Sequence, residues 1–175
     1  MLHQASDFFK ASGQMTSMLY KESIEALLRT PNCGGFQLLD LHDFPGQGTA
    51  LVGILDPFWD SKGIIAPEKF REFCSPTVPL LRLNKRTFFN DEKLSALAEL
   101  YHYGDAPLKN IQINWEIRNN EKKVIDSGKF KSRNVAVGSL DSLGNLSAVF
   151  SKIETPQKLT ISIFYGQNIK NSWDI

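Results

Sequence analysis

The chain has 175 residues, 42% of them hydrophobic, and its 20 Lys and Arg against 19 Asp and Glu give a formal net charge of +1. This composition suits one ordinary globular domain or two small ones, and it excludes disordered, collagen-like and fibrous chains. Because the charge is balanced, we expect no nucleic acid and no anionic membrane among the partners.

The chemistry-bearing residues are sparse. Cys33 and Cys74 are too few for a disulfide framework or a thiolate zinc site, although one bridge between them stays open. None of the three histidines is paired at helical i, i+4 spacing, so we expect no metal site, and we expect no cofactor. The first residues lack a signal-peptide pattern and no apolar run is long enough to span a bilayer, so the compartment stays open.

The first part of the chain has helical and then strand-like patterns. A helix is predicted over Met15 to Arg29, where apolar residues recur at helical spacing until Pro31 ends it. The apolar run Phe36 to Leu41 predicts a short strand buried on both faces, as in a parallel α/β sheet. The polar loop from His42 to Gly48 follows it, at the end of a strand where α/β folds bind ligands.

The pattern changes further along the chain. A short helix is predicted over Ala66 to Phe73, and Ser75 to Pro79 predicts a linker. After Leu80 the apolar period becomes two, which is typical of strands with one wet face. The predicted strands are 94–103, 111–117, 122–130, 135–137 and 159–165. We therefore predict an α+β, mostly β chain, with a short α/β segment at residues 1–79 and an antiparallel β-sandwich at residues 80–175.

The order of these pieces, together with several short motifs, resembles a known family. The motifs are Gly-Gly-Phe-Gln-Leu-Leu-Asp-Leu-His-Asp at 34–43, Asp-Pro-Phe-Trp-Asp-Ser-Lys-Gly at 56–63, Asn-Trp-Glu-Ile at 114–117, Ser-Gly at 127–128 and Asn-Ser-Trp-Asp-Ile at 171–175. They resemble the end of the catalytic barrel and the following immunoglobulin-like domain of glycoside hydrolase family 2, the β-galactosidase type. The resemblance implies that residues 1–79 are the tail of a TIM barrel, that residues 80–175 are an immunoglobulin-like sandwich, and that the parent enzyme acts in carbohydrate metabolism in the periplasm or outside the cell.

The resemblance also implies that this chain is a C-terminal fragment without catalytic residues. The retaining mechanism needs two carboxylates about 5 Å apart, and the resemblance places both upstream of Met1. Glu121 follows Asn120 in a predicted sandwich turn, where it is a solvated hairpin residue. We therefore expect this chain alone to be inactive. The alternative is a stand-alone module whose sandwich binds a carbohydrate or a protein.

Five residues are candidates for contact with a carbohydrate. Asp40, His42 and Asp43 put titratable groups at one strand end, Gln47 adds an amide to the same loop, and Trp59 offers an aromatic face to a pyranose. Four of them, Asp40, His42, Asp43 and Trp59, have a structural alternative. The Asp and His side chains can cap the loop, Asp43 can form an Asx turn before Phe44, and Trp59 can pack between barrel and sandwich.

The predicted strand Phe36 to Leu41 has no obvious sheet neighbour in the sequence. An unpaired apolar strand favours association with another chain. We therefore expect either a homodimer through residues 1–75 or a local hairpin in which Leu51 to Leu55 pairs with this strand.

Overall fold

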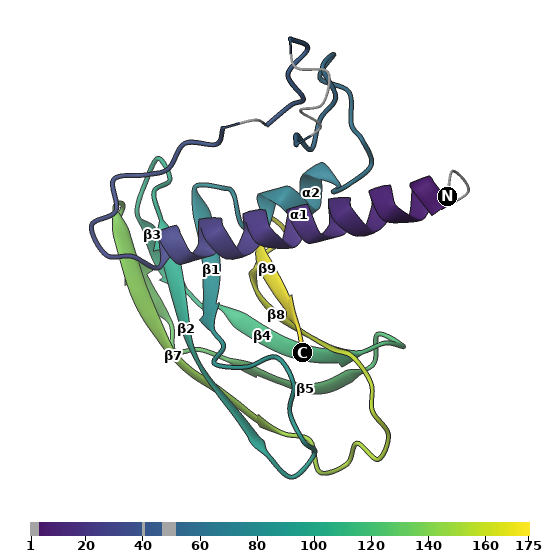
Figure 1. The fold of residues 1–175 in the computed structure, drawn as a ribbon. Helices are drawn as coiled ribbons and strands as arrows, with labels where there is room; N and C mark the ends of the chain where they lie inside the picture. Colours follow the sequence, from purple (N-terminus) through teal and green to yellow (C-terminus); the bar gives the residue numbers. More distant parts are fainter. Residues whose placement is uncertain (1–3, 40, 47–51) are drawn as a thin grey trace. The chain divides into compact units, whose positions relative to one another are not determined.

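A computed structural model describes residues 4–39, 41–46 and 52–175 of the chain (Figure 1). The chain divides into two compact units, Met1–Phe73 and Cys74–Ile175. Within the described residues, no helix is long and apolar enough to cross a membrane.

The first unit contains the two helices, α1 (Ala5–Leu28) and α2 (Pro67–Arg71). The predicted helix at Met15 to Arg29 is confirmed at its C-terminal end, where the hydroxyl of Thr30 donates to the carbonyl of Ala26 at 2.9 Å before Pro31. Its N-terminus lies further upstream, because residues 5–14 continue the helix although their apolar spacing is weaker. The short second helix is confirmed, with Pro67 in its first turn.

The predicted strand at Phe36 to Leu41 is wrong for the residues that the structure describes, which contain only isolated bridges in this unit. The carbonyl of Leu41 accepts from the backbone N–H groups of Ile54 and Leu55 at 3.1 and 3.2 Å, and the N–H of Asp43 donates to Leu55. A strand needs a neighbour along its whole length to satisfy its backbone groups, and here only its last residues find one. The expected hairpin is also wrong, because His42 and Leu55 pair in parallel and Leu51 lies outside the described residues.

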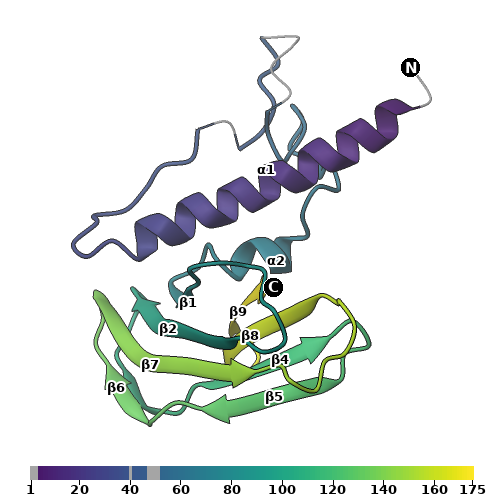
Figure 2. The ribbon, with the colours of Figure 1, turned by 60° about the horizontal axis from the view of Figure 1, so that its bottom comes forward.

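The second unit is an antiparallel β-sandwich (Figure 2), which confirms the predicted fold class. One sheet has the order β1-β2-β7, the other has the order β5-β4-β8-β9, and β3 pairs with β6 separately. The strands are β1 (Thr77–Arg82), β2 (Lys93–His102), β3 (Leu108–Ile111), β4 (Asn114–Asn119), β5 (Val124–Lys129), β6 (Arg133–Val135), β7 (Ser139–Val149), β8 (Leu159–Tyr165) and β9 (Ile169–Asp174).

Three strands, β1, β7 and β9, lie where the sequence predicts none. β1 occupies most of the predicted linker and crosses the predicted boundary between Pro79 and Leu80. Pro79 is tolerated because β1 is an edge strand that pairs only with β2 within its sheet. β7 is hidden in the sequence because a bulge interrupts its alternation. Opposite Ala98 and Glu99 the pairing skips Leu143, which is buried, and the next buried residue is Leu146.

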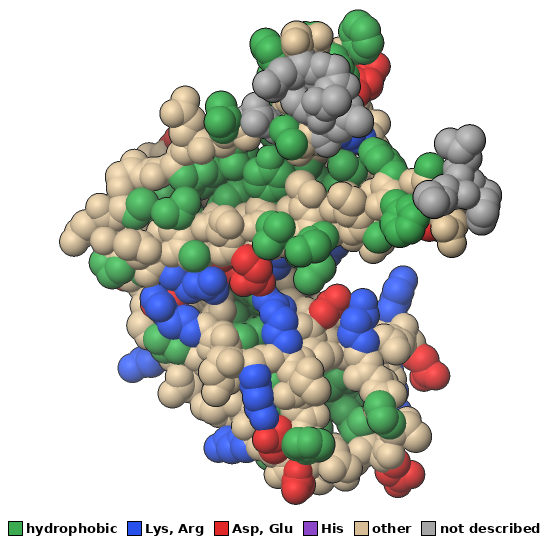
Figure 3. Space-filling model, viewed as in Figure 1, with side chains coloured by type: hydrophobic (Ala, Val, Ile, Leu, Met, Phe, Trp, Pro, Cys, Tyr) green, Lys and Arg blue, Asp and Glu red, His purple; other side chains and the backbone are tan. Residues whose placement is uncertain are grey.

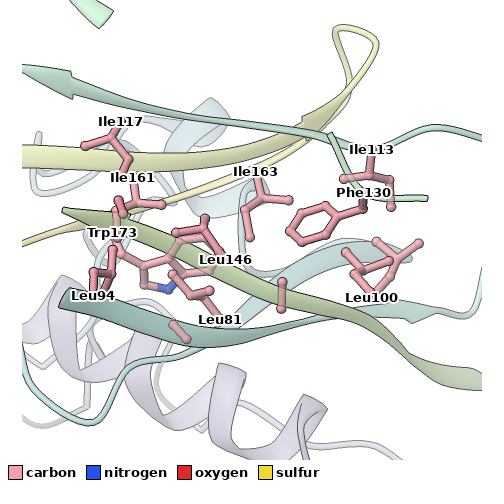
Figure 4. Packing of buried hydrophobic residues seen from close by; sticks show 14 of the residues in the cluster. Leu81, Leu94, Leu100, Ile113, Ile117, Phe130, Leu146, Ile161, Ile163 and Trp173 are labelled. Carbon is pink, nitrogen blue, oxygen red and sulfur yellow. The ribbon is translucent and has the colours of Figure 1, made fainter. Parts of the chain in front are cut away.

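The hydrophobic core lies between the two sheets (Figure 4). Figure 4 shows Leu81 and Leu94 of one sheet facing Ile161 and Trp173 of the other. Trp173 is fully buried, whereas Trp115 is half-buried and packs against the core. The core therefore forms from this unit's own side chains.

A buried polar contact joins the edges of the two sheets. The side-chain amide of Asn171, on β9, donates to the carbonyl of Pro79, on β1, at 2.9 Å. Its oxygen accepts from the N–H of Ser172, and the side chain has no exposed surface. The contact fixes β1 against β9 at the side of the sandwich.

Candidate functional site

The candidate site lies in the loop between α1 and α2, and the carboxylate of Asp43 is its centre. Asp43 is 3% exposed. Its Oδ1 accepts from the backbone N–H of Gly53 at 2.9 Å, and the ammonium of Lys62 donates to its two oxygens at 3.0 and 2.9 Å. Because both oxygens are engaged and the charge is neutralised, Asp43 serves as a structural anchor for the loop.

Gly53 makes this arrangement possible by its small size. A Cβ atom at this position would lie 2.4 to 2.6 Å from backbone atoms of His42 and Asp43, which no side chain can accept. The carbonyl of Gly53 also accepts from Lys62 at 2.8 Å. The sequence-based alternative of an Asx turn at Asp43 is therefore replaced by a bond across the loop to residues 53 and 62.

His42 is oriented by the same backbone. Its Nδ1 lies 2.7 Å from the carbonyl oxygen of Asp43, which can only accept, so Nδ1 carries a proton and donates in this contact. The ring centroid lies 4.4 Å from that of Trp59, with the planes tilted by 43°. The two rings form one aromatic surface.

Trp59 is held in an uncommon backbone conformation. Its φ of 71° lies in the left-handed region, which bulky residues rarely adopt, and its side chain is 60% exposed. The carboxylate of Asp56 accepts from the N–H groups of Phe58 and Asp60 at 2.8 and 2.9 Å and so fixes the turn around Trp59. The turn therefore holds the side chain of Trp59 in an exposed position, although a large aromatic side chain is more stable when it is buried.

Three of the five predicted site residues come together here: His42 and Trp59 touch, and Asp43 anchors the loop beneath them. Asp40 and Gln47 lie outside the described residues. Lys62 is not among the predicted site residues, although it lies in the quoted motif at 56–63. The signal that could have identified Lys62 is a lysine three residues after Trp59, in the same unit as the candidate Asp43 that needs a cation.

The exposed side chain of Trp59 and the imidazole of His42 beside it combine an apolar face with a hydrogen-bonding group. Across residues 4–39, 41–46 and 52–175, no cluster of His, Cys, Asp or Glu is arranged to hold a metal ion.

Burial shifts the pKa values of two side chains outside this site, Lys21 and Cys74. Burial lowers the pKa of the Lys21 ammonium, and its ion pair with the buried Glu25 opposes that shift. Burial raises the pKa of the Cys74 thiol, so this thiol is less reactive than a solvated one. Both fit structural roles.

The family comparison concerns the sandwich. A family described as a domain of unknown function (DUF8488) matches residues 92–175, slightly less than half of the chain. A search among curated proteins finds no match.

Among solved structures, the chain is similar at low identity to glycoside hydrolases and to a sporulation control protein. A putative β-galactosidase from Bacteroides fragilis is 7% identical with a TM-score of 0.40, over 57% of this chain and 16% of that one. A β-glucuronidase from Parabacteroides merdae is 11% identical with a TM-score of 0.39, over 57% of this chain and 13% of that one. The sporulation control protein Spo0M from Bacillus subtilis is 12% identical with a TM-score of 0.36, over 57% and 46%. The match thus spans less than half of each of these chains.

The buried ion pair gives a direct stability prediction. Replacing Lys62→Met leaves the carboxylate of Asp43 buried without its cation, which costs about 3–5 kcal/mol for a buried pair. Hydrogen exchange should therefore show large losses of protection at the amides of Gly53 and Leu55. The matched control is Lys69→Met, whose ion pair with Glu72 is at the surface and is worth at most about 1 kcal/mol. Unchanged protection in Lys62→Met would show that the pair does not order this loop.

Proposed function

We propose that this chain is the C-terminal part of a glycoside hydrolase resembling family 2. In this proposal residues 1–73 complete a catalytic barrel, the sandwich supports it, and the catalytic carboxylates are supplied by a preceding part of the same polypeptide. The chain's own role is structural and substrate-bordering. The sequence resemblance supports the proposal, and the apolar surface of the first unit carries it.

That surface follows one side of α1. Phe8, Met15 and Leu19 recur at spacings of one or two turns and are all more than 45% exposed, while Gly13, Ile24 and Leu28 are buried on the other side of the helix. Figure 3 shows hydrophobic side chains gathered along α1 on the face in view. A surface helix has one apolar face, whereas a helix that is apolar on two faces is an internal element of a larger structure. The barrel of a parent enzyme would supply the cover.

The segment after α1 also exposes large apolar side chains. Leu39 is 83% exposed and Phe36 is also exposed, although the run is as apolar as a doubly buried strand. Between this segment and α1 lies a hollow of about 320 Å³ lined by Leu19, Ile24, Leu27 and Phe36 among others. We infer that a neighbouring barrel strand fills this hollow and pairs with residues 36–41 in the parent enzyme.

The candidate site acquires a role in this setting. The eighth strand of a barrel ends at the face where substrates bind, and His42 would directly follow that strand. His42 and Trp59, held by the ion pair of Asp43 and Lys62, would then border the substrate, with Asp40 and Gln47 as further proposed contacts. The sugar would stack on the exposed ring of Trp59 and form a hydrogen bond through a hydroxyl with Nε2 of His42.

The size of the native polypeptide tests the proposal. An antibody raised against this chain should detect, in extracts of the source cells prepared with protease inhibitors, a protein well above the 19.7 kDa of this sequence. Extracts from cells in which the gene is deleted provide the control. A single band at 19.7 kDa would contradict the proposal and favour the alternative, a stand-alone binding module.

We predict that the purified chain does not hydrolyse aryl glycosides, because without both carboxylates neither the covalent step nor the proton transfer can occur. The measurement is release of the aryl group across a panel of α- and β-glycosides. A matched variant carries Asp40→Asn and His42→Ala and leaves the structural Asp43 intact. Turnover that this variant abolishes would contradict the proposal, whereas turnover that it retains would identify a contaminating enzyme.

A homodimer through residues 1–75 follows from the same apolar surface when the chain is isolated. Covering a large apolar side chain stabilises association by about 1.5–3 kcal/mol before the costs of ordering. Light scattering should therefore give twice the 19.7 kDa mass for the chain. The double variant Met18→Glu and Leu39→Glu should give the monomer mass, while the control Gln14→Glu should stay dimeric. A monomeric unmodified chain, or a dimer that survives the double variant, would refute this interface.

A further inference from the structure

A second hollow lies wholly within the sandwich, at one end of it. It has a volume of about 530 Å³ and lies between the loop that joins β1 to β2, the loop that joins β7 to β8, and the last residue, Ile175. This volume falls within the ordinary range of small-ligand sites, roughly 300–1,000 Å³. The candidate site in the first unit shares none of its residues.

The walls of this hollow are fastened to each other. The side-chain amide of Asn90, in the first loop, donates to the carbonyl of Ile153, in the second, at 3.0 Å. The guanidinium of Arg86 donates to the carbonyl of Asp174 at 3.2 Å, and the rings of Phe88 and Phe150 meet edge to face with centroids 6.3 Å apart. Because the walls are joined across 63 to 88 residues of sequence, the hollow is formed before any ligand arrives, which lowers the entropic cost of binding.

The first loop is braced internally as well. The carboxylate of Glu92 accepts from the ammonium of Lys85 at 2.6 Å and from the N–H of Phe89 at 2.7 Å. These two interactions hold the pKa of Glu92 below its usual value. The brace fixes the backbone of Phe89, whose ring is nevertheless 75% exposed. The interactions of Glu92 thus hold the loop in a conformation that leaves the ring of Phe89 exposed beside the hollow.

The polar side chains around the hollow define the ligand's chemistry. They provide amides, hydroxyls, one guanidinium and one carboxylate, from Asn90, Gln157, Thr87, Thr155, Arg86 and Glu154. Sugar hydroxyls both donate and accept hydrogen bonds, so they need a lining with both kinds of group, as here. The single Arg and single Glu cancel in charge, which disfavours phosphates, nucleic acids and other strongly charged ligands.

We propose that this hollow binds a short neutral saccharide, with one pyranose ring against Phe89 and its hydroxyls against the amides of Asn90 and Gln157. The aromatic ring covers the apolar C–H face of the sugar, and the rim satisfies its hydroxyls. The site lies entirely in the sandwich, so it stands whether the chain belongs to a larger glycosidase or works as a separate module.

Saturation-transfer NMR on the full chain tests the site with lactose, cellobiose, maltose and xylobiose as probes. We expect at least one of them to bind and the variant Phe89→Ala to weaken it tenfold or more. Phe89 is exposed, so this variant should keep the near-UV circular dichroism of the unmodified chain. The control Tyr165→Ala removes an exposed aromatic side chain that does not line the hollow, and it should leave binding unchanged.

Three outcomes would overturn the proposal. The first is that none of the four saccharides gives transfer. The second is that binding survives Phe89→Ala, which would place the sugar elsewhere, such as at Trp59. The third is that a blocked Phe-Leu dipeptide binds and is lost in Phe89→Ala while the saccharides do not bind, which would identify the hollow as a peptide site. None of these outcomes depends on the size of the native polypeptide, so they are separate from the test of the glycosidase proposal.

Discussion

The ion pair between Asp43 and Lys62 is the constraint on which the order of the loop between the two helices depends. This stretch has little regular structure, only two isolated bridges among its described residues. Burying two charges is costly, and the cost is offset only when the remaining hydrogen-bonding groups are satisfied. Here the N–H and the carbonyl of Gly53 complete the pair. The ion pair therefore acts as a small polar core where the loop has few apolar contacts of its own.

The candidate site follows from that constraint. His42 precedes Asp43, and Trp59 lies three residues before Lys62, so fixing the pair also brings the two rings to 4.4 Å. The turn at Asp56 adds the local bonds that hold Trp59 at positive φ. Backbone strain of this kind persists only where the surroundings over-determine it. A displayed and strained aromatic residue beside an oriented imidazole is consistent with a binding surface.

The sequence predicts the sandwich well, because each of its regular strands carries its own alternation. The strand at Leu159–Tyr165 is predicted to the residue, and Lys93–His102 nearly so. The exceptions have local causes. Pro79 is untypical of a strand and hides the edge strand β1, the bulge at Leu143 interrupts the alternation of β7, and in β9 the polar Asn171 occupies one of the two buried positions. The strand expected at Phe36 to Leu41 fails for a different reason, since a strand exists only where a neighbour pairs with it, and no local pattern reveals that neighbour.

The same distinction separates the predictable from the unpredictable part of the site. A cluster of polar residues after an apolar run pointed to His42 and Asp43, and the aromatic face of its side chain pointed to Trp59. The pairing of Asp43 with Lys62 depends on a close approach of two backbone segments that only Gly53 permits, and composition does not encode it. Because of that pairing, Asp43 anchors the loop and is not a ligand contact as the sequence had suggested.

The two units also differ in how completely they bury their own apolar side chains. The sandwich buries its large apolar residues between its two sheets and closes its edge with the bond from Asn171 to Pro79. The first unit buries Ile24 and Leu28 but leaves Phe8, Met15, Met18 and Leu39 in contact with water. Uncovered apolar surface of this extent is stable only at low concentration or beneath a partner. If the proposed parent enzyme exists, cover from the rest of its barrel would remove the need for a second copy, because both forms of cover would occupy the same face of α1.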